Sequence, residues 1–178
     1  MDEVGGTGAV GNLNYFDMRR AGEGAVALQI EAEDFDAGGP GIGYSDLSPG
    51  NDGGQYRATD VDIASAEDVG GGYTVGWMFA GEWLAYTVDI GAAGKYTLQA
   101  RVASGGAGGT FHVEVDNIDV SGTLTIPDTG GWHAWWTIEA PVTLPGGHRR
   151  VRVVLDSNGA TGAVGNLNYL RLTSVPGS

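Results

Sequence analysis

The sequence contains no cysteine among its 178 residues, so a disulfide framework and thiolate chemistry are both excluded. Basic residues are also few: 9 Lys and Arg stand against 22 Asp and Glu, which gives a formal net charge of −13. Nucleic acids and anionic membrane surfaces bind through clustered Lys and Arg, so we expect neither as a partner. No apolar run approaches the roughly 20 residues that a membrane-spanning helix needs.

Motifs for the common enzyme chemistries are missing as well. The three histidines, His112, His133 and His148, show no zinc-ligand spacing. The sequence has no P-loop, no nucleophile elbow and no dinucleotide-binding fingerprint between a strand and a helix. A glycoside hydrolase would need two carboxylates that face each other across a cleft, for instance Asp46 with Asp62 or Glu67. This rival function could be recognised by the release of reducing sugar.

What the sequence does contain is glycine, 33 residues of it, with 42% hydrophobic residues and many short segments of alternating polarity. This combination predicts an all-β fold, either a sandwich or a barrel. The strands are expected at residues 27–33, 82–90, 95–103, 110–115, 123–126, 135–140, 149–155 and 166–172. The long stretch from Gly38 to Gly72 is rich in Gly, Asp and Ser, and we expect it to be a functional or ion-stabilised loop.

One nine-residue segment occurs twice without change, as Thr7–Tyr15 and as Thr161–Tyr169. The second copy lies where the last strand of the sandwich is expected. We therefore predict that residues 1–22 are either the last strand of a preceding, similar module or a linker, and that residues 23–175 form the sandwich. A monomer is expected, although residues 7–15 could also pair with a neighbouring molecule in a strand-swapped assembly.

Five tryptophans are many for one small domain: Trp77, Trp83, Trp132, Trp135 and Trp136. Trp83, Trp135 and Tyr86 lie inside strand patterns, which favours packing in the core. Trp77 and Trp132 instead lie beside glycine turns, where an indole tends to be exposed. Sugar rings present flat C–H faces that stack on aromatic rings, so this pair predicts a carbohydrate platform.

Six segments then occur in an order that resembles carbohydrate-binding module family 6, and together they span residues 26–173. They are Ile30–Phe35, Gly81–Tyr86, Gly94–Leu98, Arg101–Ser104, Thr129–Trp132 and Asn166–Tyr169. The resemblance implies a non-catalytic, antiparallel β-sandwich of the jelly-roll type that is appended to a glycoside hydrolase, with a sugar site in the loops at one end. There, two aromatic residues enclose a sugar ring and an Asn binds its hydroxyl groups. Trp77, Trp132 and Asn166 match those positions.

The family also carries a structural Ca²⁺, and the matching ligands here are Glu31, Glu33, a main-chain carbonyl near Tyr73, and Asn168. Glu31 and Glu33 are two residues apart on a predicted strand, so their side chains would point the same way about 6.5–7 Å apart. This arrangement favours an ion over a facing acid–base pair. Asn168 replaces the more common Asp, which lowers the ligand charge.

The segment Tyr44–Arg57 resembles the longer loop of modules attached to agarases and β-1,3-glucanases. Asp46 and Asn51 could line the sugar pocket or hold a second Ca²⁺, and a role in stabilising the loop is an equal alternative. Tyr44 and Asp46 are the residues of this segment that we expect to bind the sugar. Trp83 and Glu114 match residues that some relatives use in a second cleft on the concave sheet face.

The expected function is capture of the non-reducing end of an agar-type galactan or a β-1,3-glucan by a secreted module. The alternative outside carbohydrate binding and hydrolysis is a protein-binding adhesion module, in which Trp77 and Trp132 would contact a protein.

Overall fold

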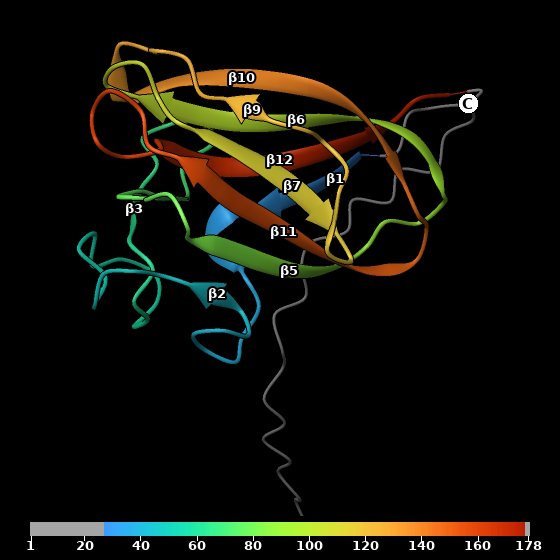
Figure 1. Ribbon diagram of the computed structural model, residues 1–178, viewed down its shortest axis with the longest axis horizontal. Helices are drawn as coiled ribbons and strands as arrows, with labels where there is room; N and C mark the ends of the chain where they lie inside the picture. Colours follow the sequence, from blue (N-terminus) through green and yellow to red (C-terminus); the bar gives the residue numbers. More distant parts are fainter. Residues whose placement is uncertain (1–26, 177–178) are drawn as a thin grey trace, which may run out of the picture.

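The computed structural model describes residues 27–176, which form two antiparallel β-sheets packed face to face (Figure 1). The expected antiparallel β-sandwich is confirmed. The expectations for residues 1–22 lie outside the described residues.

The first sheet has the order β10-β6-β12-β4-β3, and β1 also pairs with β12. Its strands are β1 (Ala27–Glu31), β3 (Ile63–Ser65), β4 (Tyr73–Val75), β6 (Gly94–Ser104), β10 (Gly131–Leu144) and β12 (Asn166–Ser174). The second sheet has the order β2-β5-β11-β7-β8, and β9 also pairs with β7. Its strands are β2 (Tyr44–Ser45), β5 (Trp83–Asp89), β7 (Thr110–Val115), β8 (Ile118–Asp119), β9 (Leu124–Thr125) and β11 (His148–Ser157).

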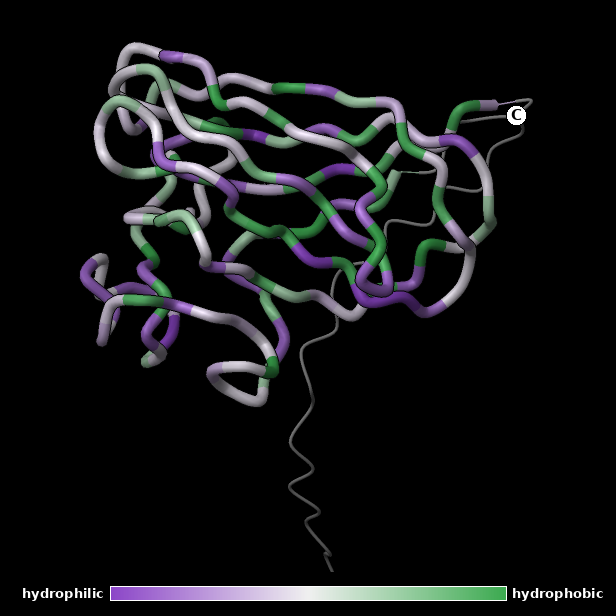
Figure 2. The backbone as a smooth tube through the Cα atoms, viewed as in Figure 1, coloured by the Kyte–Doolittle hydropathy of each residue, from purple (hydrophilic) through white to green (hydrophobic). Residues whose placement is uncertain are grey.

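The core lies between the sheets because every second residue of the main strands is apolar and points inward. In β6, Tyr96, Leu98, Ala100 and Val102 are buried, and in β11 the same alternation buries Val151, Val153 and Leu155. Figure 2 shows this alternation as green segments separated by paler and purple ones along the strands.

One prediction about the N-terminal half is wrong. The first strand ends at Glu31, and Ala32–Asp34 form a short 3₁₀ helix, η1, so Glu31 and Glu33 do not lie on one strand. The stretch from Gly38 to Gly72 is mainly loop, as expected, and it contains two short strands: β2 pairs with β5 and β3 pairs with β4. In Figure 1 this long loop projects beside β2 and β3.

Several connections meet at one end of the sandwich, at the left of Figure 1. These are the β4–β5, β6–β7, β9–β10 and β11–β12 connections. No helix within residues 27–176 is long and apolar enough to cross a membrane.

Candidate functional site

Trp77 lies in the β4–β5 connection, between two residues that anchor the chain in the interior. Gly76 and Met78 are buried, whereas the Trp77 side chain is 45% exposed. The Trp77 backbone adopts a left-handed conformation with φ of 46°, which is uncommon for a bulky residue. This turn directs the indole outward, as the flanking glycine predicted.

Trp132 is 39% exposed and lies near the start of β10. Its ring packs over Gly105: a Cβ atom on that glycine would stand 3.1 Å from Trp132 Nε1. Thr129 holds the preceding turn, since its Oγ1 accepts the main-chain N–H of Ser104 at 2.8 Å. The absence of a side chain at Gly105 therefore leaves room for the indole in this position.

Asn166 lies between the segments that carry the two tryptophans. Its Nδ2 donates to the main-chain oxygen of Trp132 at 2.9 Å. Its Oδ1 would be 3.0 Å from a Cβ placed on Gly76, the residue before Trp77. The structure therefore brings Trp77, Trp132 and Asn166 to one place, at the end of the sandwich where the loops meet.

The long loop is fastened to the Trp77 segment by Glu82, which sequence reasoning did not single out. This carboxylate is buried and accepts the main-chain N–H of Leu47 at 3.0 Å and that of Phe79 at 2.8 Å. A second attachment is the bond from Gly76 N to the Asp62 carbonyl, at 3.0 Å. The loop therefore flanks the Trp77 side of the site.

Asp46 lies in this flanking segment and is half-buried. Burial raises the pKa of its carboxyl above the ordinary value, and the charge of Asp60 adds to the effect, although bonds from Ser48 oppose both. Its Oδ1 accepts the main-chain N–H of Ser48 at 2.8 Å. Of the two carboxylates suggested as hydrolase partners of Asp46, Asp62 is buried, whereas Glu67 is exposed and has a φ of 50°.

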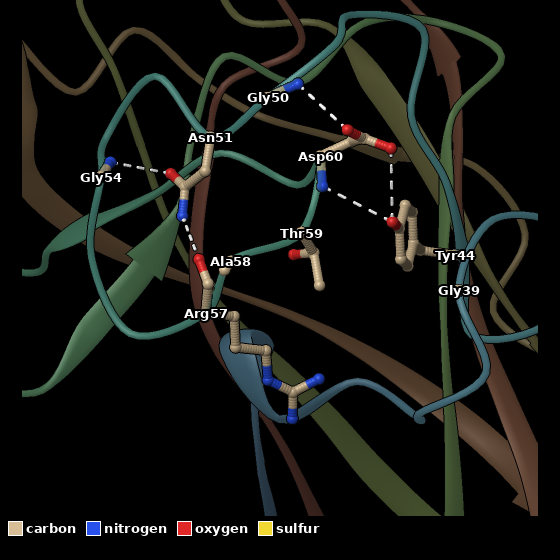
Figure 3. Close-up of a pocket in the computed structure, with 9 residues that line it drawn as sticks. All are labelled: Gly39, Tyr44, Gly50, Asn51, Gly54, Arg57, Ala58, Thr59 and Asp60. Atoms are coloured by element: carbon tan, nitrogen blue, oxygen red, sulfur yellow. Dashed lines mark hydrogen bonds between the residues drawn. The ribbon is translucent and has the colours of Figure 1, made fainter.

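The long loop also borders an open cavity of about 730 Å³, shown in Figure 3. Its lining residues are Gly39, Tyr44, Gly50, Asn51, Gly54, Arg57, Ala58, Thr59 and Asp60. Trp77, Trp132 and Asn166 are not among them, so this cavity is separate from the aromatic pair.

Two residues of this cavity hold the loop together. The Asn51 amide donates to the carbonyls of Gln55 and Arg57, and its oxygen accepts from Gly54 and Ile63. Tyr44 is 3% exposed, with its ring 5.3 Å from that of Phe35. The Tyr44 ring is thus packed in the core, while its hydroxyl donates to Asp60 Oδ2 at 3.4 Å beside the cavity, so a sugar-binding role for Tyr44 stays a prediction.

Trp83 and Glu114 do come together on the outer face of the second sheet. Arg152 connects them: its guanidinium carbon is 4.9 Å from the centroid of the Trp83 ring, and its Nε is 3.1 Å from Glu114 Oε2. His112 is part of the same face, with Nδ1 at 2.9 Å from Asp156 Oδ1. Trp83 is half-buried and faces outward rather than into the core, so a role in a sheet-face cleft stays a prediction.

The segments that carry the predicted calcium ligands lie together, although Glu31 and Glu33 do not share a strand. η1 lies against β4 and β12, which carry Tyr73 and Asn168, and the Tyr73 backbone donates a hydrogen bond to Glu33. Glu33 is buried, and its Oε2 has no hydrogen-bond partner. Burial raises the pKa of Glu33 to about 7, and the charges of Glu31 and Asp34 add to this rise.

Asn168 is buried, and its Nδ2 donates to Asp68 Oδ2 at 3.0 Å, which leaves the amide oxygen for another partner. No group of three or more His, Cys, Asp or Glu side chains within residues 27–176 is arranged to hold a metal. A cation here would need two carboxylates together with amide and main-chain oxygens. These residues fit Ca²⁺, which prefers oxygen ligands, and the unpaired Glu33 oxygen is the clearest sign of such a role.

The family model "Carbohydrate binding module (family 6)" matches residues 54–174, which is more than half of the chain. The chain belongs to this family. The family is non-catalytic and binds carbohydrate, so the hydrolase and adhesion alternatives are set aside.

Two curated relatives illustrate the relationship. The clotting factor G alpha subunit of Tachypleus tridentatus is 32% identical over 68% of this chain and 18% of its own length. A β-agarase, AgaA, of Microbulbifer thermotolerans is 30% identical over 41% of this chain and 17% of its own. The chain thus spans less than a fifth of these relatives.

Two solved structures are similar over most of both chains. A module of Cellvibrio mixtus lichenase 5A, in complex with cellotriose, has a TM-score of 0.63 at 31% identity and covers 83% of this chain and 97% of its own. The C-terminal module of the laminarinase LamC from Zobellia galactanivorans has a TM-score of 0.62 at 26% identity and covers 84% of this chain and all of its own.

Proposed function

We propose that this module binds a polysaccharide by enclosing a sugar ring between Trp77 and Trp132, with Asn166 binding its hydroxyl groups. The observation that carries the proposal is the placement of two exposed indoles on either side of one buried amide. C–H groups of a pyranose stack on such rings, and the Asn166 oxygen can accept a hydrogen bond from a sugar hydroxyl group. We expect an affinity of about 10⁻⁴–10⁻⁶ M, which is sufficient for a tethered module.

The ligand we favour is a neutral or weakly anionic β-glycan, either an agar-type galactan or a β-1,3-glucan. The β-agarase and the laminarinase among the similar proteins support these two choices. The net charge of −13 disfavours strongly sulfated polymers.

Capture of a non-reducing chain end is the binding mode that fits the long loop. Glu82 fastens this loop beside Trp77, with Leu47 exposed next to Gly81. A loop on one side of the Trp77–Trp132 pair would obstruct a polysaccharide chain that extends past the site in both directions. Asp46, in the same segment, is the residue that we expect to border the sugar.

A structural Ca²⁺ is the second part of the proposal. Glu31, Glu33, Asn168 and the main chain near Tyr73 would hold the ion. It would supply positive charge to the buried carboxylate of Glu33 and link η1 to β4 and β12.

We also propose that the module is secreted, monomeric and appended to a glycoside hydrolase, which it keeps close to its substrate. The modest affinity of a single site is useful in that setting because tethering raises the effective concentration of the enzyme on the polymer.

Affinity electrophoresis in gels that contain agarose, laminarin, xylan or cellulose oligomers tests the proposal. Retardation by agarose or laminarin, but not by xylan or cellulose oligomers, is the expected result. Unchanged mobility in all four gels would contradict it.

A further inference from the structure

The first part of β10 is irregular next to the proposed sugar site. Gly131 is opposite Ser104 and Trp136 is opposite Val102. An advance of five residues along β10 therefore matches an advance of only two residues along β6. The extra residues bulge out of the ladder, as in an enlarged β-bulge. The bulge shortens the distance along β10 and keeps Trp136 close to the turn that carries Trp132.

Contacts within the bulge separate its side chains into two groups. His133 and Trp135 both reach the carbonyl of Ala66: His133 Nδ1 is 3.3 Å from this oxygen, and Trp135 Nε1 donates to it at 2.7 Å. Trp132 instead packs over Gly105, beyond the end of β6. Trp136 is opposite Val102, three residues earlier on β6, which corresponds to roughly 10 Å along the strand.

Trp136 is 60% exposed, more than either Trp77 or Trp132. Ala134, between Trp132 and Trp136, is small and exposed, so it leaves the surface open. The strand therefore presents a second large aromatic face to water at a short distance from the first.

We propose that Trp136 is a second aromatic platform that stacks on a sugar residue farther along the bound polysaccharide. The ligand of the complete surface is then an oligosaccharide of several residues rather than a single chain-terminal sugar. This inference rests on the proposed function of Trp77 and Trp132 and extends it along β10.

A protein partner fits this surface less well than a sugar chain. One indole offers far less than the roughly 800 Å² that each partner buries in a stable protein interface. Pairing of β10 with a second copy is opposed by the bulge, by Pro141 and by exposed Glu139 on the same strand.

The test is calorimetry with a disaccharide and a hexasaccharide: laminaribiose and laminarihexaose, or the corresponding agaro-oligosaccharides, according to the polysaccharide that retards the wild type. Trp136→Ala should bind the hexasaccharide roughly 3- to 10-fold more weakly and the disaccharide as the wild type does. Trp136→Phe, which keeps an aromatic face, should recover most of the loss. Ile118→Ala removes another exposed apolar side chain, 67% exposed on β8, and should change neither affinity.

Equal binding of the hexasaccharide by Trp136→Ala and the wild type would overturn the second platform. So would an equal loss for both oligosaccharides, because Trp136 would then act in the first site or in the fold. Trp132→Ala distinguishes failure of the second platform from failure of the proposed function. If this variant still binds the disaccharide, the proposed sugar site between Trp77 and Trp132 is wrong.

Discussion

The side-chain amide of Asn166 donates a hydrogen bond to the main-chain oxygen of Trp132 at 2.9 Å. The bond fixes the amide, so its oxygen is directed toward Gly76 and the Trp77 segment. Asn166 thus holds the main chain at Trp132 and directs its side-chain oxygen toward the segment that carries Trp77. A polar group with this double role should matter more for sugar binding than for folding.

Replacement of Asn166 by alanine tests this role. Asn166→Ala should weaken sugar binding by about 1–3 kcal/mol, because it removes a hydrogen-bonding group and leaves the Trp132 carbonyl without its donor. Calorimetry measures the loss. Asn158→Ala is the matched control, since Asn158 accepts the main-chain N–H of Ala80 at the same end of the sandwich. An equal loss in the control would mean that general loosening of the loops, rather than Asn166 itself, explains the effect.

Gly105 should set the position of the Trp132 ring. In Gly105→Ala the new methyl group would meet Trp132 Nε1 at 3.1 Å and push the indole from its preferred rotamer. Such a displacement costs about 0.5–1.5 kcal/mol, so sugar affinity should fall roughly 3- to 10-fold. In Gly131→Ala the methyl group meets only Ala134 Cβ, at 3.7 Å, and affinity should hold. Equal affinities for the two variants would disprove the role of Gly105.

Removal of Ca²⁺ should destabilise the protein. If the free ion is present at about 100 times its Kd, chelation removes about 2.7 kcal/mol, which lowers Tm by roughly 5–10 °C. Glu33→Gln should abolish the response, because it removes the buried carboxylate whose Oε2 has no partner. Glu139→Gln, an exposed carboxylate on β10, should respond as the wild type does. A wild-type Tm that chelation leaves unchanged would contradict the structural ion.

His112 should make stability depend on pH. Burial opposes its charge, but the hydrogen bond and charge of Asp156, together with Glu114 and Asp119, outweigh this and raise the pKa of His112 above 6.5. Because the folded pKa is the higher one, the contribution is complete below pH 6.5 and is lost as pH rises through the folded value. Urea denaturation between pH 5.5 and 8.5 should therefore show a decline that His112→Gln reduces. The same decline in that variant would assign the effect to other groups.

Alternation of polarity was enough to locate the main strands, because each buries one face against the other sheet. The alternation fails at Glu33, where η1 ends the first strand although the apolar–polar pattern continues. Strand β4 was not predicted because its three residues, Tyr73–Val75, are too few to show a period.

The site could be predicted only in part, because local sequence indicates exposure but does not reveal contacts with residues distant in the chain. Glycines beside Trp77 and Trp132 indicate exposure, and both rings are exposed in the structure. Tyr44 has the same kind of glycine neighbour, yet its ring packs on Phe35, a contact that no local pattern reveals. Glu82 and Gly105 also escaped prediction, since their roles depend on partners distant in sequence.

The most direct test of the account is calorimetric titration of the wild type, Trp77→Ala and Trp132→Ala with the oligosaccharide that the wild type binds, each checked for an unchanged thermal melt. If the two indoles enclose one sugar ring, each single substitution should abolish measurable heat while the fold is preserved. Binding that persists in both variants would contradict the central claim.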